Sequence, residues 1–140
     1  IILPTGLYGD PVLPSHLNHN PFIWLKRVIE GGNPRHEKIP NDSASMIHLR
    51  DLAKIFLAVY ENPNASGRYF GVYKSLHWYD IYNECKKLIP NMSMPIKFSD
   101  KPVEPTGFDF TRRDSLKVHI RDFSTTLKET INWLKSKPFE

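Results

Sequence analysis

The sequence predicts an α/β protein whose sheet is incomplete within this chain. Short apolar stretches typical of strands alternate with longer stretches in which apolar residues recur with helical spacing. The predicted strands cover residues 1–3, 67–73 and 94–98, with a short extended segment at 46–49. So few short strands could not cover one another, and we therefore expect the sheet to continue outside these 140 residues.

The first strand is an apolar run that ends at Pro4, which is typical of a buried parallel strand. It begins without Met and without a turn signal, so we interpret it as a strand already in progress in a longer protein. Residues 5–11 contain glycines and a proline and predict a turn. Residues 12–19 predict a polar loop with two histidines.

Two helices are predicted in the first half of the chain. Asn20 would cap the first, with Pro21 at its first position, and the glycines at 31–32 would end it. Asp51 would cap the second helix or place a negative charge at its start, and this helix runs to about Glu61. Apolar residues surround most of this second helix, which predicts that it is buried on most sides.

The second half predicts two long helices and a short one. The clearest amphipathic pattern begins at Ser75 or His77 and ends at Pro90. A short helix is predicted at 114–118, and Ser124 would cap the last helix.

Composition excludes several classes of function. The net charge is +4, but the basic residues are scattered among acidic ones, which predicts no nucleic-acid partner. The single cysteine, Cys85, excludes an intrachain disulfide and a cysteine-based zinc site, and it fits a cytoplasmic protein. The apolar runs are too short to span a bilayer, so no membrane partner is expected.

Four segments, taken in order, resemble the extended short-chain dehydrogenase/reductase family, also called the NAD-dependent epimerase/dehydratase family. Residues 3–11 resemble its Pro-x-x-x-Tyr-Gly-Pro turn, and residues 46–53 its phrase Phe-Ile-His-Val-x-Asp-Leu-Ala. Residues 61–70, followed by the Leu-His-Trp at 76–78, resemble the dihydroflavonol reductase and cinnamoyl-CoA reductase branch. The last segment is Phe-Asp-Phe at 108–110 with the C-terminal helix.

This resemblance implies a Rossmann-like cofactor domain followed by a smaller substrate domain. Residues 1–140 would then be the C-terminal substrate-binding portion, an incomplete sheet plus a helical subdomain, with the N-terminal cofactor domain absent. The intact protein would use NADP or NAD to reduce the carbonyl group of a small aldehyde or ketone. The chain alone is predicted to be inactive.

The resemblance also assigns site residues. By the family pattern, Pro4, Thr5 and Leu7 would contact the cofactor. Independently of the resemblance, the long polar loop from Tyr8 to Pro21 is the predicted binding loop, and a variable surface connection stays open as its alternative. The predicted substrate contacts are Tyr8, Asp10 and Phe22. We predict no catalytic residue in this chain, because the family's Ser/Thr and Tyr-x-x-x-Lys are missing from the matching place. We also predict no metal-binding residue, for the reason given below for the two loop histidines. Asp10 also departs from the family pattern and lengthens the turn.

One stretch does spell Tyr-x-x-x-Lys, from Tyr82 to Lys86. Its tyrosine lies on the apolar side of a helix that follows the turn, so we interpret Tyr82 as a core residue. His16 and His19 could be metal ligands, but without a third partner we interpret them as loop residues.

His48 could be a base oriented by Asp51, and His77 could also take part in chemistry. We interpret both histidines as residues at helix starts. Cys85 is expected to pack as a small apolar residue.

Two alternative functions remain open at this point. One is a sugar-nucleotide epimerase or dehydratase of the same family. The other is a non-catalytic member that binds a dinucleotide as a sensor.

Overall fold

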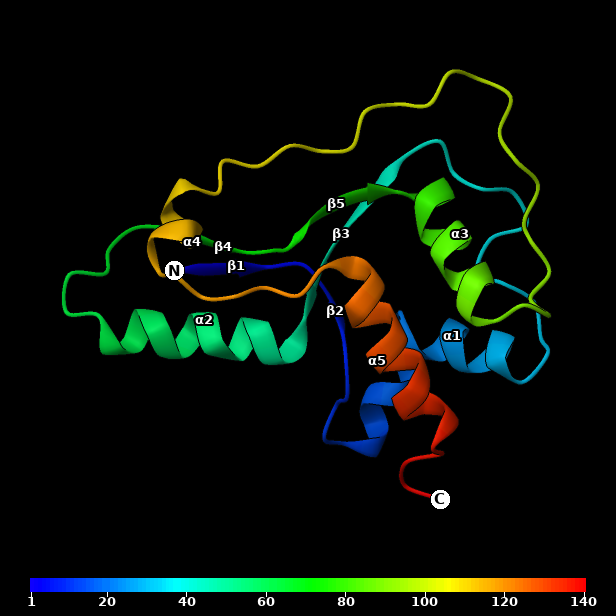
Figure 1. Cartoon of the computed structure of the whole chain (residues 1–140), viewed down its shortest axis with the longest axis horizontal. Helices are drawn as coiled ribbons and strands as arrows, with labels where there is room; N and C mark the ends of the chain where they lie inside the picture. Colours follow the sequence, from blue (N-terminus) through cyan, green and yellow to red (C-terminus); the bar gives the residue numbers. More distant parts are fainter.

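The computed structural model describes residues 1–140 and confirms the α/β class. The strands are β1 (Ile2–Pro4), β2 (Gly6–Tyr8), β3 (Ser43–His48), β4 (Tyr69–Gly71) and β5 (Lys74–His77). The helices are η1 (Pro14–Asn18), α1 (Phe22–Ile29), α2 (Leu49–Glu61), α3 (Trp78–Leu88), α4 (Thr111–Ser115) and α5 (Phe123–Lys135). Figure 1 shows α2 alongside β1 and β4, while α1, α3 and α5 gather at the other end.

The strands form two small sheets, and the chain passes from the first sheet to the second at Thr5, between β1 and β2. β1 pairs in parallel with β4, with Leu3 opposite Phe70. After Thr5 the chain continues as β2, which pairs in parallel with β3, and β3 pairs antiparallel with β5. The predicted turn over residues 5–11 was therefore wrong in its first half, because β3 supplies the partner that makes Gly6–Tyr8 a strand.

The segment predicted as one strand over 67–73 is interrupted. The chain changes partner there, from β1 to β3. Arg113, from α4, donates hydrogen bonds from Nη1 to the carbonyl oxygens of Val72 (2.6 Å) and Tyr73 (2.8 Å). Its guanidinium lies 3.6 Å from the ring centroid of Phe110. The Arg113 guanidinium thus satisfies the carbonyl groups of the two residues that separate β4 from β5.

Several predicted boundaries were wrong by a few residues. β3 begins at Ser43 rather than at 46, because β5 pairs with its first half. Residues 94–98 form only one bridge, between Ile96 and Lys38, because no longer partner strand runs beside them. The short helix lies at Thr111–Ser115 rather than at 114–118.

Three helix caps differ from the predictions. Pro21, not Asn20, occupies the cap position of α1. His48 rather than Asp51 caps α2, as described below, while Asp51 lies in the first turn and so fits the alternative of a charge at the helix start. The last helix is capped by Asp122 rather than Ser124, and its carboxylate accepts a 2.8 Å hydrogen bond from the Thr125 amide. The sequence offers several capping side chains in each place, and packing selects among them.

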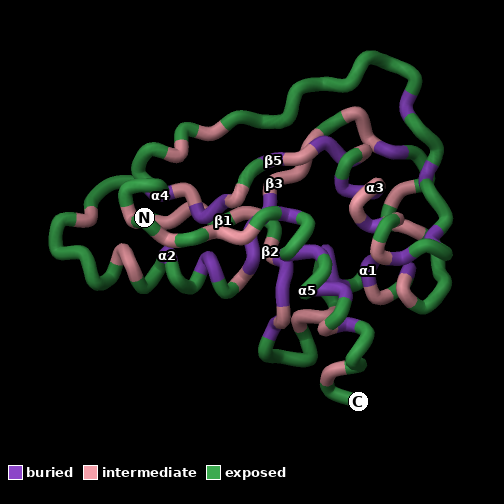
Figure 2. Tube along the Cα trace, in the orientation of Figure 1, coloured by how far each residue is buried: buried purple, intermediate pink, exposed green.

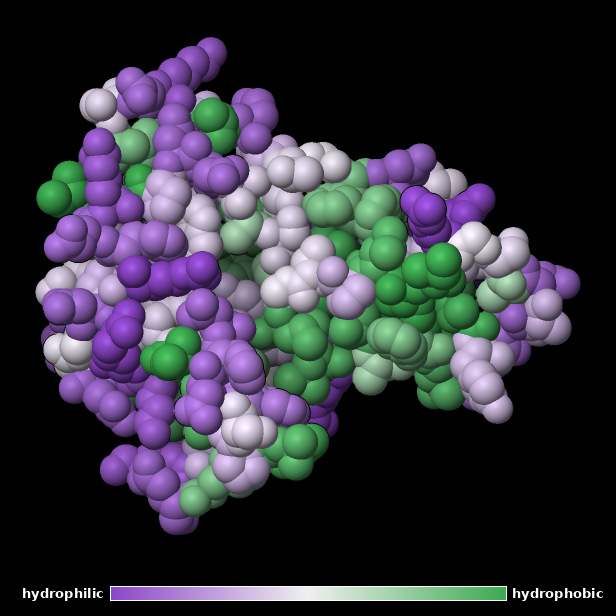
Figure 3. Space-filling model, turned by 180° about the vertical axis from the view of Figure 1, so that it is seen from behind, coloured by the Kyte–Doolittle hydropathy of each residue, from purple (hydrophilic) through white to green (hydrophobic).

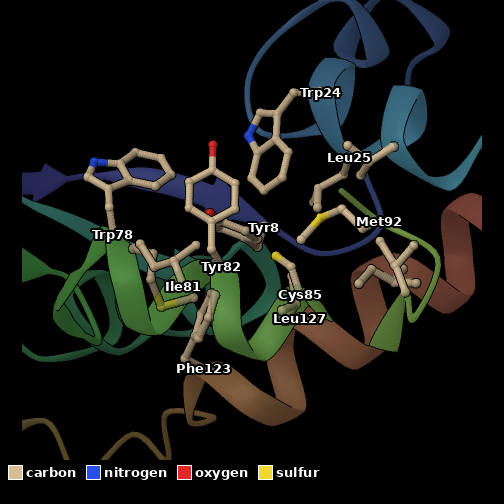
Figure 4. Packing of buried hydrophobic residues seen from close by; sticks show 14 of the residues in the cluster. Tyr8, Trp24, Leu25, Trp78, Ile81, Tyr82, Cys85, Met92, Phe123 and Leu127 are labelled. Atoms are coloured by element: carbon tan, nitrogen blue, oxygen red, sulfur yellow. The ribbon is translucent and has the colours of Figure 1, made fainter. Parts of the chain in front are cut away.

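The main core lies between α1, α3, α5 and the strands β2 and β3 (Figures 2 and 4). The rings of Trp24 and Tyr82 lie 5.8 Å apart at its centre. Tyr82 and Cys85 are both fully buried, which confirms that each is a core residue. The ammonium of Lys86 bonds the carbonyl oxygens of Pro90 and Met92, so this lysine closes the end of α3.

A smaller core lies between α2 and β3 and consists of Leu52 and Ile55 from the helix and Ile47 from the strand. The prediction that α2 is buried on most sides was wrong for this chain. Phe56 and Leu57 are 52% and 54% exposed, because only one face of α2 packs on the strands. Seen from behind, apolar surface gathers over the β1 and α2 end (Figure 3).

A long segment arches from α3 back to α4 across the molecule (Figure 1). Asn41 anchors it: the side-chain amide donates to the carbonyl of Lys101 (2.9 Å), and its oxygen accepts from the Val103 amide (3.0 Å). No helix of this structure combines the length and apolar character that crossing a membrane requires.

Candidate functional site

A cavity of about 470 Å³ opens where β1 ends and the chain turns into β2. It is lined by Thr5, Gly6, Leu7, Pro11, Val12, His16, His19, Asn20, Phe22 and Leu49. Most of the lining atoms are carbon, with a few polar groups from the loop and from Thr5. Ligands of α/β folds bind at the carboxyl ends of parallel strands, which is where this cavity lies.

Three of the predicted site residues meet in this cavity. Thr5, Leu7 and Phe22 all line it, although Phe22 belongs to α1 and the other two to the chain around β2. The hydroxyl of Thr5 is buried and has no hydrogen-bond partner in the structure. A buried polar group without a partner is uncommon, and here it fits a ligand that brings a polar atom.

The other predicted residues lie elsewhere. Pro4 ends β1 next to Thr5 but is not among the residues that line the cavity. Tyr8 points into the main core, with its ring edge-on to Phe123 at 5.7 Å (Figure 4). Burial raises the pKa of Tyr8, so its hydroxyl stays protonated. Asp10 forms an ion pair with Arg50 outside the cavity.

The predicted binding loop supplies further lining residues that the sequence analysis did not assign. Pro11, Val12 and Asn20 line the cavity, as do the two loop histidines, His16 and His19. The signal for these residues was their place in the predicted binding loop from Tyr8 to Pro21. The spacing of these residues in the sequence matches no motif that would have predicted a binding site.

A second, polar pocket of about 390 Å³ contains Asp10 and Arg50. Its other lining residues are Arg121, Glu129, Asn132 and Trp133. The Arg50 guanidinium bonded to Asp10 lowers the pKa of that carboxyl, so Asp10 stays ionised. This pair fixes the turn after β2 to the start of α2.

Asp51, the residue that the sequence suggested as a partner for His48, is used differently. Its carboxylate is fully buried and accepts two hydrogen bonds from Arg121, one from Nη1 (2.7 Å) and one from the backbone amide (2.8 Å). The carboxylate is therefore satisfied by Arg121, and the interpretation of His48 with Asp51 as base and orienter has no support in the geometry.

His48 itself is a structural histidine, as the sequence analysis interpreted it. Its Nδ1 accepts a 3.1 Å hydrogen bond from the Arg50 amide and so caps α2. Its Nε2 lies 2.9 Å from Oε2 of Glu129. Since Nδ1 is an acceptor, the ring proton is assigned to Nε2. Burial, followed by the nearby Arg121, lowers the pKa of His48 and favours the neutral ring.

His77 has the same role at the next helix. Its Nδ1 accepts from the Tyr79 amide at 3.0 Å and caps α3, and its Nε2 lies 2.9 Å from Oδ1 of Asn41. The interpretation of His77 as a residue at a helix start is confirmed.

Comparison with known proteins identifies relatives along the whole chain. No known protein-family profile matches it. The cinnamoyl-CoA reductase CAD2 of Medicago truncatula is 30% identical over 140 residues, which are 99% of this chain and 41% of that protein. The dihydroflavonol 4-reductase of Dianthus caryophyllus is 37% identical over 96 residues, which are 60% of this chain and 25% of that protein.

Solved structures share the fold. The Bordetella bronchiseptica enzyme WbmF, in complex with NAD⁺, matches 97% of this chain and 45% of its own with a TM-score of 0.77 and 16% identity. The yeast methylglyoxal/isovaleraldehyde reductase Gre2, in complex with NADPH, matches 96% of this chain and 46% of its own with a TM-score of 0.71 and 15% identity.

The chain thus spans about two fifths of the length of the curated reductases that match nearly all of it. The ordered motifs, the sequence relatives and the fold agree. The chain matches part of an extended short-chain dehydrogenase/reductase, and its relatives in sequence are cinnamoyl-CoA reductases and dihydroflavonol reductases.

Proposed function

We propose that the protein to which this chain belongs is an NAD(P)H-dependent reductase that converts the carbonyl group of a small aldehyde or ketone into an alcohol. The observation that carries the proposal is the apolar cavity at the carboxyl end of β1, with Thr5, whose buried hydroxyl has no partner, in its wall. The relatives named above are reductases that match the chain from end to end or over most of it, which supports the same reaction class.

In this proposal Thr5 and Leu7 form the cofactor side of the cavity, and Pro4 stands next to them at the end of β1. Proline has a fixed φ and no N–H, so Pro4 would present a rigid apolar surface to a flat nicotinamide ring. The Thr5 hydroxyl would hydrogen-bond a polar atom of the cofactor and so gain the partner that it lacks. The cofactor, NADP or NAD, would supply the hydride when bound, and these residues would orient it.

The substrate would lie on the opposite side of the cavity, against Phe22 and Val12. His16 and His19 could donate hydrogen bonds to its oxygen atoms from the loop. An apolar cavity with a few polar groups fits a small, partly aromatic carbonyl compound. Tyr8 is not included in this site because it is buried in the main core.

We also propose that residues 1–140 are the C-terminal substrate-binding portion and that a cofactor-binding portion covers β1 and α2. Parallel strands are normally buried on both faces, yet β1 and β4 form a sheet of two. Ile1, Phe56 and Leu57 are all more than half exposed beside that sheet. In the intact protein, Leu57→Asp should therefore lower the melting temperature and weaken NADPH binding.

The control for this change is Val103→Asp, since Val103 is 44% exposed and lies on the long arching segment. That substitution should leave both quantities unchanged. Equal effects of the two substitutions would argue against a covered α2 face.

The reaction itself is tested by following NADPH oxidation by the intact protein with aromatic aldehydes, aliphatic aldehydes and flavonoid ketones. Turnover is expected with at least one of these classes and none with the isolated chain. Interconversion of a nucleotide sugar would support the epimerase alternative instead. Dinucleotide binding without any turnover would support the sensor.

We further propose that the protein acts in the cytoplasm. The thiol of Cys85 is fully buried, and burial raises its pKa to about 12, so it stays protonated and unreactive. An unpaired cysteine fits a reducing compartment. Fractionation of cells that express the intact protein tests this placement.

A further inference from the structure

The last long helix, α5, packs beside β2 and β3, the two strands whose ends border the cavity (Figure 1). Thr130 lies at this contact and is fully buried. Its hydroxyl donates a 2.7 Å hydrogen bond to the carbonyl of Thr126, one turn earlier in α5. The same oxygen accepts a 2.8 Å hydrogen bond from the amide of Gly9. One hydroxyl thus ties the end of β2 to a helix that is distant in the sequence.

Gly9 has little freedom to move at this point. Its φ is +124°, a conformation that residues with a side chain rarely adopt. A Cβ on Gly9 would lie 2.9 Å from Cε1 of His48 and 3.0 Å from Cγ of Leu49. The backbone of Gly9 therefore fits closely against the junction of β3 and α2.

The contacts of Gly9 connect directly to the cavity wall. Pro11, two residues later, lines the cavity, and so does Leu49, against which Gly9 packs. The neighbour of Thr130 in α5, Glu129, contacts His48, the residue before Leu49. Two adjacent residues of α5 therefore hold the two strand ends that frame one side of the cavity.

We propose that Thr130 is a positioning residue: its hydroxyl holds the Gly9 amide and thereby sets the place of the Pro11 turn in the cavity wall. This inference rests on the proposed function for its effect on the reaction. Its structural part, the bond to Gly9, can be tested without any substrate.

Thr126 provides a matched control. It lies one turn earlier in the same helix, is also fully buried, and carries a hydroxyl that has no hydrogen-bond partner. Thr126→Val removes this hydroxyl at almost constant shape and breaks no hydrogen bond. Thr130→Val makes the same chemical change but leaves the Gly9 amide without its acceptor.

The experiment compares Thr130→Val, Thr130→Ser and Thr126→Val in the intact protein. The first readout is hydrogen exchange of the Gly9 amide, measured by NMR. Exchange should become roughly ten-fold faster in Thr130→Val alone, because a lost hydrogen bond of ordinary strength corresponds to about that factor. The serine variant keeps the hydroxyl and should restore slow exchange.

The second readout is steady-state kinetics with the best carbonyl substrate. Thr130→Val should raise KM about ten-fold while kcat changes by less than about two-fold, since a displaced wall weakens substrate and transition state alike. Thr130→Ser should return KM to the parent value. Thr126→Val should leave it there.

Unchanged Gly9 exchange in Thr130→Val would overturn the inference, and so would equal changes of KM in both valine variants. If Thr130→Val does not fold, Thr130→Cys replaces it, because sulfur is a weaker acceptor and should give intermediate exchange. If the intact protein reduces no carbonyl compound, the proposed function fails, while the exchange measurement still decides the role of Thr130.

Discussion

His48 and Glu129 lie far apart in the sequence, yet His48 Nε2 and Glu129 Oε2 are 2.9 Å apart. The same imidazole caps α2 through Nδ1, so both of its nitrogens are occupied. Protonation of Nδ1 would replace an acceptor by a donor that faces the Arg50 amide, and the cap would be lost. The contact therefore makes the junction between α2 and α5 sensitive to pH.

The first prediction concerns stability as the pH falls. Burial and Arg121 lower the pKa of folded His48, while the unfolded chain has an ordinary histidine pKa of about 6.5. Between these two values the unfolded state binds more protons than the folded state, so the free energy of unfolding decreases as the pH falls below about 6.5. The groups that face His48 are Arg50, Asp10, Asp51, Arg121 and Glu129.

Urea unfolding at a series of pH values from neutral to mildly acidic measures this effect. His48→Asn retains a capping side chain but removes the titrating ring, so it should flatten the dependence over that range. A dependence as steep in His48→Asn as in the parent would assign the pH sensitivity to other groups.

A second prediction compares two ion pairs that differ in burial. Asp51 is fully buried and is bonded by Arg121, so Arg121→Met leaves a buried carboxylate without its cation. Removing one partner of a buried pair typically costs about 3–5 kcal/mol of unfolding free energy. Arg50 is exposed in its pair with Asp10, where solvent screens the two charges, so Arg50→Met should cost clearly less unfolding free energy than Arg121→Met.

Chemical denaturation of the two variants gives both values. Similar losses of unfolding free energy in the two variants would contradict the view that the buried Asp51 carboxylate depends on the Arg121 guanidinium.

A third prediction concerns the cofactor. Thr5→Val in the intact protein removes the unpartnered hydroxyl from the cavity wall and should weaken NADPH binding roughly ten-fold, as measured by quenching of intrinsic fluorescence. Thr5→Ser keeps the hydroxyl and should bind as the parent does. Tighter folding of Thr5→Val with unchanged NADPH affinity would show that the hydroxyl meets no cofactor atom.

A fourth prediction tests the interpretation that Tyr82 and Lys86 spell Tyr-x-x-x-Lys by chance and take no part in the reaction. Burial raises the pKa of Tyr82 to about 12, and its hydroxyl lies 2.8 Å from Nδ1 of the half-buried His36. Tyr82→Phe should cost about 1 kcal/mol of stability and leave kcat of the intact protein unchanged. Lys86→Met should likewise leave kcat unchanged while it loosens the end of α3.

Calorimetric melting and steady-state kinetics on the same samples provide these two measurements. A large loss of kcat in Tyr82→Phe at unchanged stability would instead place Tyr82 in the reaction.

The parts of the fold that sequence patterns predicted are those with a local cause. The amphipathic spacing around Tyr82 and Cys85 predicted α3 and their burial, because one helix face must leave water. The position of His77 at a helix start was equally local. By contrast, β2 was predicted as part of a turn, since a strand of three residues exists only where a partner such as β3 lies beside it.

The candidate site divides in the same way. By itself, the sequence determined the family resemblance, the α/β class and the loop that carries the cavity, because these follow from short ordered motifs and from the spacing of apolar residues. Tertiary structure alone decided that Tyr8 points into the core, that Asp51 forms its ion pair with Arg121, and that the Thr130 hydroxyl accepts a hydrogen bond from the Gly9 amide. Each of these depends on which distant segments meet, and the physical reason is that a buried polar group takes whichever partner packing brings within hydrogen-bond reach.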